Sequence, residues 1–128
     1  MRRLAGDPPS PWEGPFGFSR VVSAGEFVLV GGTTSVDVDG VVQGITPYEQ
    51  TSVILQKIGH ELGRAGASFA DVIQTRVYMT DISRAEEVGR AHGEVFAEIR
   101  PLMTGVEVSA LIDPRMLVEI EAVAYLPA

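Results

Sequence analysis

Residues 100–124, RPLMTGVEVSALIDPRMLVEIEAVA, are typical of two strands separated by a short polar turn. Val106 and Val108 alternate with small or polar residues, and the segment 118–124 alternates in the same way. A period of two predicts strands with one apolar face and one face of mixed polarity. The mixed face carries glutamates, among them Glu119. We expect the function to depend on what surrounds these carboxylates.

The glutamates of this mixed face have few basic residues beside them in the two strands. If another subunit covers the face, at least one carboxylate becomes partly buried, and a buried carboxylate needs a partner or a shifted protonation equilibrium. We therefore expect the mixed face to be a subunit interface that carries the function. Its three glutamates are Glu107, Glu119 and Glu121.

The composition of the chain fits one domain, 1–128, that is large enough for a hydrophobic core. A net charge of −7 disfavours nucleic acid as a partner, because phosphates require a basic surface. The chain has no cysteine and only two histidines, so no metal site is expected. No apolar run approaches the roughly 20 residues that span a bilayer, and the N-terminus is not a secretory signal. We expect a cytoplasmic protein without membrane contact.

The first half of the chain predicts an arm, two strands and a helix. Residues 1–15 are rich in proline and glycine and are expected to form an extended arm. Strands are predicted at 18–22 and 26–30, and the glycine pair after them indicates a β-bulge or a close approach of the backbone to another group. The segment 46–49, Thr-Pro-Tyr-Glu, is typical of a helix start, and Gly66 of its end.

The second half predicts a strand at 72–80 and a second helix that opens with a capping box at 83–86. Pro101 blocks continuation of that helix, and His92 falls on its apolar stripe. Two amphipathic helices cover only one face of a sheet. The other face would expose apolar side chains such as Val123, so we expect a second subunit to cover it.

Six segments along the chain together carry a family resemblance. They are GPFGFSRVV (14–22), FVLVGGT (27–33), DVIQTRVYMTD (71–81), VGRAHGEVF (88–96), RPLMTGVEV (100–108) and MLVEIEAVA (116–124). In this order they resemble the YjgF or reactive-intermediate deaminase (Rid) superfamily. The resemblance implies an α+β, chorismate-mutase-like fold, in which a six-stranded mixed sheet carries two helices on one face. It also implies a homotrimer with clefts between subunits.

The resemblance implies an enzyme that needs no cofactor. Family deaminases hydrolyse imine and enamine intermediates such as 2-aminoacrylate, giving 2-keto acids and ammonia. An arginine two residues after a proline pairs with the substrate carboxylate. Here the proline is Pro101 and the arginine position holds Met103, which cannot make a bidentate charge-assisted contact. Loss of such an anchor costs on the order of 2–5 kcal/mol in binding, so we expect a subgroup that lacks the arginine and takes an atypical small-molecule substrate.

The resemblance also assigns roles to single residues. Glu119 would position the attacking water, and His92 stands where the family has a tyrosine. His92 would be either a packing residue or a near-neutral acid/base group at the cleft. The predicted substrate-binding residues are Phe16, with Phe18 as a rival, Gly32, Thr33, Met103, Thr104 and Gly105.

Three functions stay open at this point. The first is hydrolysis or isomerisation of a small imine, enamine or related carbonyl compound. The second is non-catalytic binding of a small ligand by the same trimer, which Met103, Gly31 and Gly89 favour because each stands where the family has a polar or charged residue. The third is a dedicated acid/base step in a biosynthetic or catabolic pathway that pairs Glu119 with His92. Ribonuclease activity, sometimes attributed to the family, is disfavoured by the negative charge.

Overall fold

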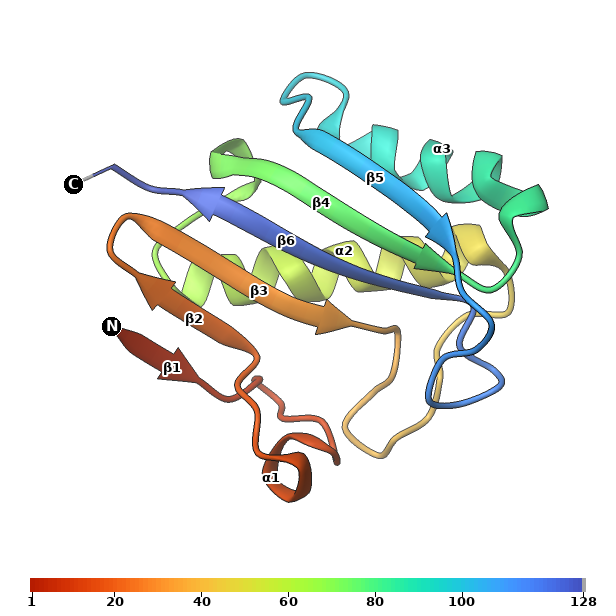
Figure 1. Cartoon of the computed structure of the whole chain (residues 1–128), viewed down its shortest axis with the longest axis horizontal. Coiled ribbons are helices and arrows are strands. Elements are labelled where there is room, and N and C mark those ends of the chain that lie inside the picture. Colours follow the sequence, from red (N-terminus) through yellow and green to blue (C-terminus); the bar gives the residue numbers. More distant parts are fainter. Residues whose placement is uncertain (128) are drawn as a thin grey trace.

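A computed structural model describes residues 1–127 and contains one six-stranded sheet (Figure 1). The strands are β1 (Arg2–Leu4), β2 (Val21–Ala24), β3 (Phe27–Thr33), β4 (Val72–Met79), β5 (Leu102–Glu107) and β6 (Val118–Tyr125). Their order across the sheet is β1-β2-β3-β6-β4-β5, and every neighbouring pair is antiparallel except the parallel pair β4–β5. The helices are α1 (Glu13–Phe16), α2 (Pro47–Arg64) and α3 (Ala85–Phe96), with 3-10 turns at Phe69–Asp71 and Ile82–Arg84.

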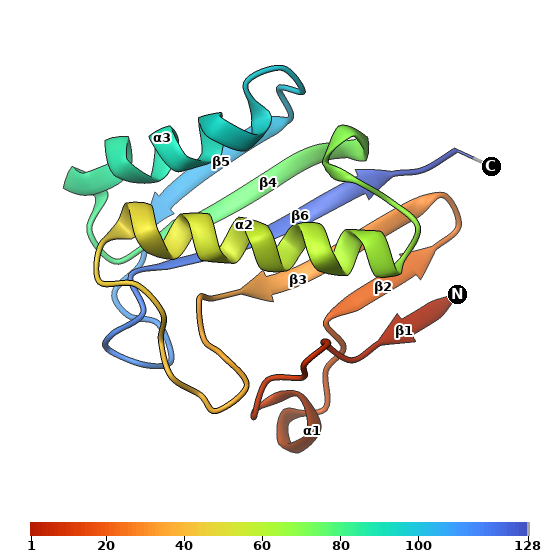
Figure 2. The same ribbon diagram turned by 180° about the vertical axis from the view of Figure 1, so that it is seen from behind.

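Helices α2 and α3 both lie on one face of the sheet, and the other face is open (Figures 1 and 2). The core forms between them because alternate residues of β6 and one stripe of α2 are apolar. This confirms the predicted α+β mixed sheet with two helices on one face. Within residues 1–127, no helix has the length and apolar character to cross a bilayer. The main core residues are Ile54, Leu55, Ile58, Leu62, Val77, Val88, Val118, Ile120, Ala122 and Ala124.

The predicted start of α2 is confirmed, whereas that of α3 is wrong in detail. The Thr46 hydroxyl accepts a hydrogen bond from the Glu49 amide, and the Glu49 carboxylate accepts one from the Thr46 amide, which forms a capping box. In contrast, α3 begins at Ala85 without a side-chain cap. Ser83 does not cap it because its amide and hydroxyl both donate to Asp81.

The two strands within 100–124 are not neighbours, contrary to what a short turn between them suggests. Strand β4 lies between β5 and β6 and pairs with both. This arrangement places Glu107 opposite Met79, whose side chain faces the helices, so Glu107 does not share the open face with Glu119. The Glu107 carboxylate instead accepts a hydrogen bond from the Ile82 amide at 3.0 Å.

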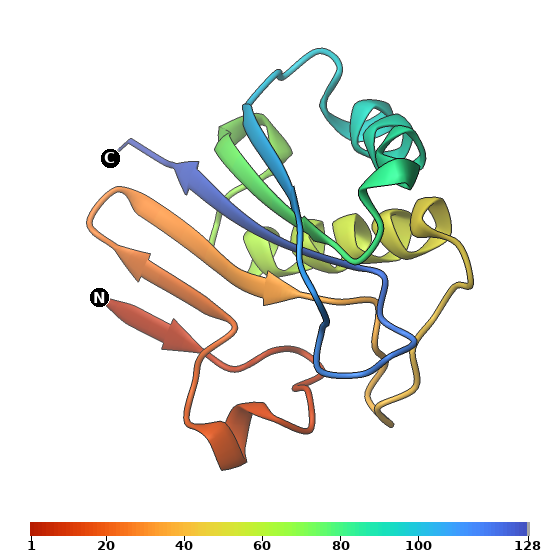
Figure 3. The ribbon, with the colours of Figure 1, turned by 45° about the vertical axis from the view of Figure 1, so that its right-hand side comes forward.

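Residues 1–15 are not an extended arm. Strand β1 pairs with β2 at the edge of the sheet, and α1 forms a single helical turn. Buried Glu13 holds the intervening loop, since its carboxylate accepts hydrogen bonds from the amides of Gly6 at 2.7 Å and Ser10 at 2.6 Å. The α1 turn and the loop that follows β3 lie at the same end of the sheet (Figure 3).

Candidate functional site

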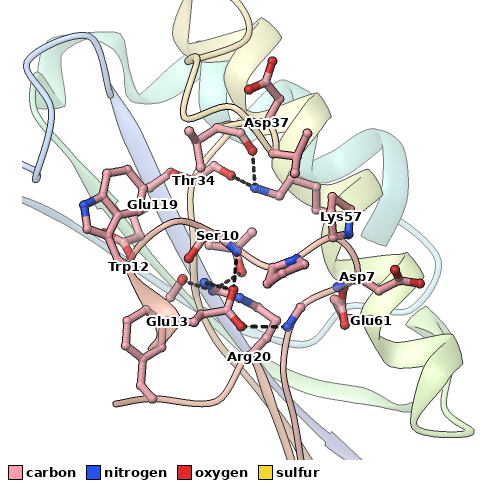
Figure 4. A pocket seen from close by; sticks show the side chains of 18 of the residues that line it. Asp7, Ser10, Trp12, Glu13, Arg20, Thr34, Asp37, Lys57, Glu61 and Glu119 are labelled. Atoms are coloured by element: carbon pink, nitrogen blue, oxygen red, sulfur yellow. Dashed lines mark hydrogen bonds and ion pairs between the residues drawn. The ribbon is translucent and has the colours of Figure 1, made fainter. Parts of the chain in front are cut away.

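A cavity of about 470 Å³ opens at this end of the sheet. Four segments line it, namely residues 6–20, 32–38, 53–61 and 112–119. Figure 4 shows side chains from the N-terminal loop, from α2 and from β6 around this space. Its volume is in the range of small-molecule sites.

Glu119 of β6 lies directly against the backbone of Gly32 in β3. The register between the two strands shifts between Val30 and Thr33, so the glycine pair forms the predicted irregularity. A Cβ atom at Gly32 would lie 2.5 Å from Oε2 of Glu119. The predicted close approach of the backbone to another group is therefore confirmed, and that group is the Glu119 carboxylate.

The Glu119 carboxylate is in an unusual electrostatic position. Burial raises its pKa above the ordinary value of 4.5, Arg20 opposes that rise, and Glu121 adds to it. No hydrogen bond from another residue within 1–127 reaches this carboxylate. A partly buried carboxylate without a partner at a cavity is suited to hold a water molecule or a polar ligand atom.

Glu121, two residues along the same strand face, is in a different state. It accepts a hydrogen bond from the Tyr78 hydroxyl at 2.7 Å and forms an ion pair with Arg76 at 3.5 Å. Glu121 therefore has partners within the sheet, whereas Glu119 has none among residues 1–127. This contrast makes Glu121 a matched reference for Glu119.

Arg20 is a cavity residue that the sequence pattern did not single out. Its Nη1 donates to the Gly32 carbonyl and, at 3.2 Å, to Oγ1 of Thr33, while Nη2 lies 3.7 Å from the Glu13 carboxylate. The side chain is 11% exposed. Arg20 therefore fixes the bulge beside Glu119 and ties it to the N-terminal loop. Glu13 begins α1 and Arg20 lies in the irregular segment between α1 and β2, so no periodicity in the sequence points to their contact.

Lys57 of α2 was also not singled out, although it is the single lysine of the chain. Its Nζ donates to the carbonyls of Thr34 at 2.6 Å and Val36 at 2.8 Å (Figure 4). Burial and, to a smaller extent, the nearby Arg20 lower its pKa to about 8. The lysine thus fastens the loop after β3 to the helix.

Five predicted site residues are brought together by the fold. They come from three separate segments, and their convergence at one cavity is a property of the tertiary structure. Trp12 lines the same cavity. The five are Phe16, Phe18, Gly32, Thr33 and Glu119.

The predicted cleft floor, Met103, Thr104 and Gly105, lies elsewhere in the single chain. These residues are exposed in the edge strand β5 and do not line the cavity. Met103 pairs with Thr75, so β4 separates it from β6. Their place in a cleft stays a prediction that requires the β5 edge of a neighbouring subunit.

His92 lies in the core and does not form an acid/base pair with Glu119. Its Nε2 is 2.9 Å from Oγ1 of Thr75, on the helix-covered side of the sheet, and its ring packs against Phe96. Glu119 is on the open side, since its neighbours Val118 and Ile120 face the helices. Burial lowers the pKa of His92. The packing alternative is therefore the one that the structure supports, because the apolar stripe of α3 faces the sheet.

The structure of residues 1–127 also bears on metal binding. No group of three or more histidine, aspartate or glutamate side chains is placed to hold an ion there. The cavity residues therefore combine one unpartnered carboxylate with two cations that already have partners.

Comparisons with known proteins agree with this architecture. The family model described as Endoribonuclease L-PSP matches residues 13–126. The crystal structure of Rv2704 from Mycobacterium tuberculosis, a member of the YjgF/YER057c/UK114 family, is 45% identical, with a TM-score of 0.87 and 98% of each chain covered. The class that fold and cavity define is thus an α+β protein with a small-molecule-sized site at one end of its sheet.

Sequence relatives extend the same match. An uncharacterized Streptomyces coelicolor protein, SCO2049, is 41% identical over 91% of this chain and 87% of its own length. A RutC family protein from Pyrococcus abyssi is 35% identical, covering 84% of this chain and 85% of its own. The chain belongs to the YjgF/RutC family, also described as Rid or Endoribonuclease L-PSP.

Proposed function

We propose that the protein hydrolyses the C=N bond of a small imine or enamine, with Glu119 holding and activating the attacking water. The observation that carries this proposal is the state of Glu119: it is partly buried, has a raised pKa, and receives no hydrogen bond from residues 1–127. A carboxylate in that state accepts a proton from water more readily than a solvated one. It also lies in a cavity of suitable size.

The surrounding residues have supporting roles in this proposal. The Gly32–Thr33 bulge brings the backbone against the carboxylate, and its amides would steady negative charge that develops on a substrate oxygen or nitrogen. Phe16 would cover the ligand. Isomerisation of a related carbonyl compound uses the same groups, because it also needs one base beside a polarised double bond.

We propose that the functional unit is a homotrimer in which a neighbouring subunit completes each cleft. The open face of the sheet supports this, because its apolar side chains are exposed in the single chain. Met103, Thr104 and Gly105 would then approach Glu119 from the edge strand of the neighbour. With methionine at this position, the cleft lacks the arginine that would anchor a carboxylate.

Two other functions have less support. The dedicated acid/base step that pairs Glu119 with His92 requires contact between side chains that lie on opposite faces of the sheet. The family description mentions ribonuclease activity, but a net charge of −7 disfavours RNA binding. Non-catalytic ligand binding in the same cavity is the remaining alternative.

The assay follows the decay of short imines in the presence of the protein. 2-Aminoacrylate is generated by a pyridoxal-phosphate dehydratase, and further imines without a carboxylate are tested beside it. We expect acceleration of at least one of them, with a loss of roughly 10²-fold or more in Glu119→Gln, the scale of general acid/base catalysis. Glu121→Gln, which alters the neighbouring partnered carboxylate, should keep the activity. No acceleration of any imine, with ligand binding retained, would favour the binding protein.

A further inference from the structure

The charged groups around the cavity differ in whether they already have hydrogen-bond or ion-pair partners within the protein. Acidic side chains outnumber basic ones, and this alone makes the space unfavourable for an anion. Hydrogen bonding decides which of these groups are available to a ligand. The acidic lining residues are Asp7, Glu13, Asp37, Glu61 and Glu119, and the basic ones are Arg20, Lys57 and His60.

The Arg20 guanidinium and the Lys57 amine, whose pKa burial lowers to about 8, both hydrogen-bond to the protein itself. Arg20 donates to the Gly32 carbonyl and to Thr33, and lies close to Glu13. Lys57 donates to two backbone carbonyls. These contacts leave a substrate carboxylate fewer N–H donors than a free arginine would offer, so neither cation fully replaces the anchor that is absent at Met103.

The cavity carboxylates other than Glu119 also have partners within the protein. Glu13 accepts two backbone amides, Asp37 accepts the amides of Asp39 and Val41, and Glu61 pairs with Arg64 at 2.6 Å. Asp7 lies 3.5 Å from His60. Within residues 1–127, Glu119 is therefore the one cavity carboxylate without a hydrogen-bond or ion-pair partner, although it packs against the Gly32 backbone and feels the charge of Arg20.

Aromatic rings accompany this unpartnered carboxylate. Phe16 and Phe18 are 64% and 42% exposed although both are large apolar side chains, and Trp12 lines the cavity with them. The Arg20 guanidinium lies 5.7 Å from the centre of the Phe18 ring, within the range of a cation–π contact. Exposed ring faces beside a carboxylate recognise organic cations that carry apolar groups.

We propose that the substrate is a protonated imine, an iminium ion, with an apolar or aromatic substituent and no carboxylate. This inference rests on the proposed function and specifies its substrate class. Glu119 would pair with the iminium N–H before the reaction, and the rings of Trp12 and Phe16 would contact the substituent. The missing arginine is then consistent with the site, because an iminium without a carboxylate needs no cationic anchor.

The reaction balances with water as the sole co-reactant. Glu119 takes a proton from water while the oxygen bonds to the iminium carbon and the C=N π pair moves to nitrogen. The Glu119 carboxylic acid then returns that proton to the nitrogen. The C–N bond breaks with its electron pair on nitrogen, and the hydroxyl proton passes to the departing ammonia. The sum is R₂C=NH₂⁺ + H₂O → R₂C=O + NH₄⁺.

The test uses two imines that differ by one carboxylate. A flavin amine oxidase produces the imine of phenylethylamine, and a flavin amino-acid oxidase produces that of phenylalanine. We expect the intact protein to accelerate hydrolysis of the first at least ~10-fold more than that of the second, a difference of about 1.4 kcal/mol. Preference for the carboxylated imine overturns this inference and leaves the proposed function standing. Acceleration of neither overturns the proposed function.

A binding measurement keeps the inference testable without catalysis. Phenylethylammonium and 3-phenylpropionate are titrated, and binding is followed by calorimetry and by fluorescence of Trp12, the single tryptophan. We expect the ammonium to bind at least ~10-fold more tightly, with that preference lost in Glu119→Gln and kept in Glu121→Gln. Equal or reversed affinities, or no binding of the ammonium, overturn the inference.

Discussion

Gly32 leaves the space that the Glu119 carboxylate occupies, since a Cβ atom at this glycine would lie 2.5 Å from Oε2. Neither a turn nor a positive φ angle requires glycine here; the neighbouring side chain does. The main-chain bulge and the carboxylate therefore form one unit, and the bulge positions the group proposed to act on water.

Gly32→Ala should displace this carboxylate and lower activity strongly. Displacement of a reacting group by about 1 Å can cost on the order of 10²-fold in rate, whereas the free energy of unfolding should change little, because the atom nearest the added methyl group is the end of the flexible Glu119 side chain. Imine hydrolysis and urea denaturation measure the two effects. Gly31→Ala is the matched control, because its Cβ would meet the Arg20 carbonyl at an ordinary 3.5 Å. Full activity in Gly32→Ala would contradict the role of the bulge.

Glu119→Gln should stabilise the protein at neutral pH while it removes activity. Burial raises the pKa of Glu119, so above that pKa the folded state holds a charge that the unfolded state solvates better. Within the window between the ordinary pKa of 4.5 and the raised one, the folded state binds more protons. The contribution of this group to stability therefore rises as the pH falls through the folded pKa.

Melting temperatures of the wild type and Glu119→Gln between pH 5 and 8 measure this contribution. The advantage of the variant should be largest at high pH and should shrink as the pH falls. Catalytic rate should change in the opposite sense, since it needs the ionised carboxylate and falls as pH decreases through the same pKa. A variant that is less stable than the wild type at pH 8 would show that Glu119 has a structural partner.

Thr75→Val should destabilise the protein without changing its chemistry. It leaves the buried His92 without its hydrogen-bond partner, a loss of about 1–3 kcal/mol in the free energy of unfolding. Thr51→Val is the matched control, because Thr51 is equally buried but its hydroxyl has no hydrogen-bond partner within residues 1–127. We expect that substitution to be neutral or stabilising. A large fall in kcat in Thr75→Val would contradict a purely structural role for His92.

The pH dependence of stability gives a second measure of His92. Burial lowers its pKa below 6.5, so protonation favours the unfolded chain. The free energy of unfolding should therefore decrease as the pH falls from 6.5 towards the lowered value. This slope should be absent in a His92→Phe variant, provided that variant folds.

Leu29→Asp should dissociate the proposed trimer. Leu29 is 39% exposed on the open face of β3, and a carboxylate there would be buried without a partner if a second subunit covers the sheet. Light scattering at micromolar concentration should show trimers for the wild type and monomers for Leu29→Asp. Ile45→Asp, which alters a residue that is 85% exposed outside the sheet, should leave the assembly unchanged. A monomeric wild type would end the proposal of a shared cleft.

Local signals in the sequence predicted local structure well. Thr46 and Pro47 marked the start of α2 because capping and the fixed φ of proline act within one turn. The glycine pair before Thr33 also predicted the bulge correctly, because it is a local signal within one strand. The capping box at Ser83 failed because Asp81, two residues earlier, competes for the serine amide and hydroxyl.

Relationships between distant segments were less accessible to sequence reasoning. The alternation in 100–124 identified two strands but not the insertion of β4 between them, since alternation fixes faces and not neighbours. That insertion turned Glu107 away from Glu119. Likewise, the apolar stripe of α3 correctly predicted that His92 lies on the buried face of the helix. The stripe alone does not show whether that face contacts the core or a cleft.

The single lysine has a consequence for chemistry in solution. Its amine lines the cavity and donates to the carbonyls of Thr34 and Val36, so an acylating reagent that enters the cavity competes with these two hydrogen bonds. With no other lysine in the chain, the N-terminus is the one competing amine. The rate of acylation of Lys57 therefore reports on access to the cavity, and a bound ligand that covers the lysine should slow it.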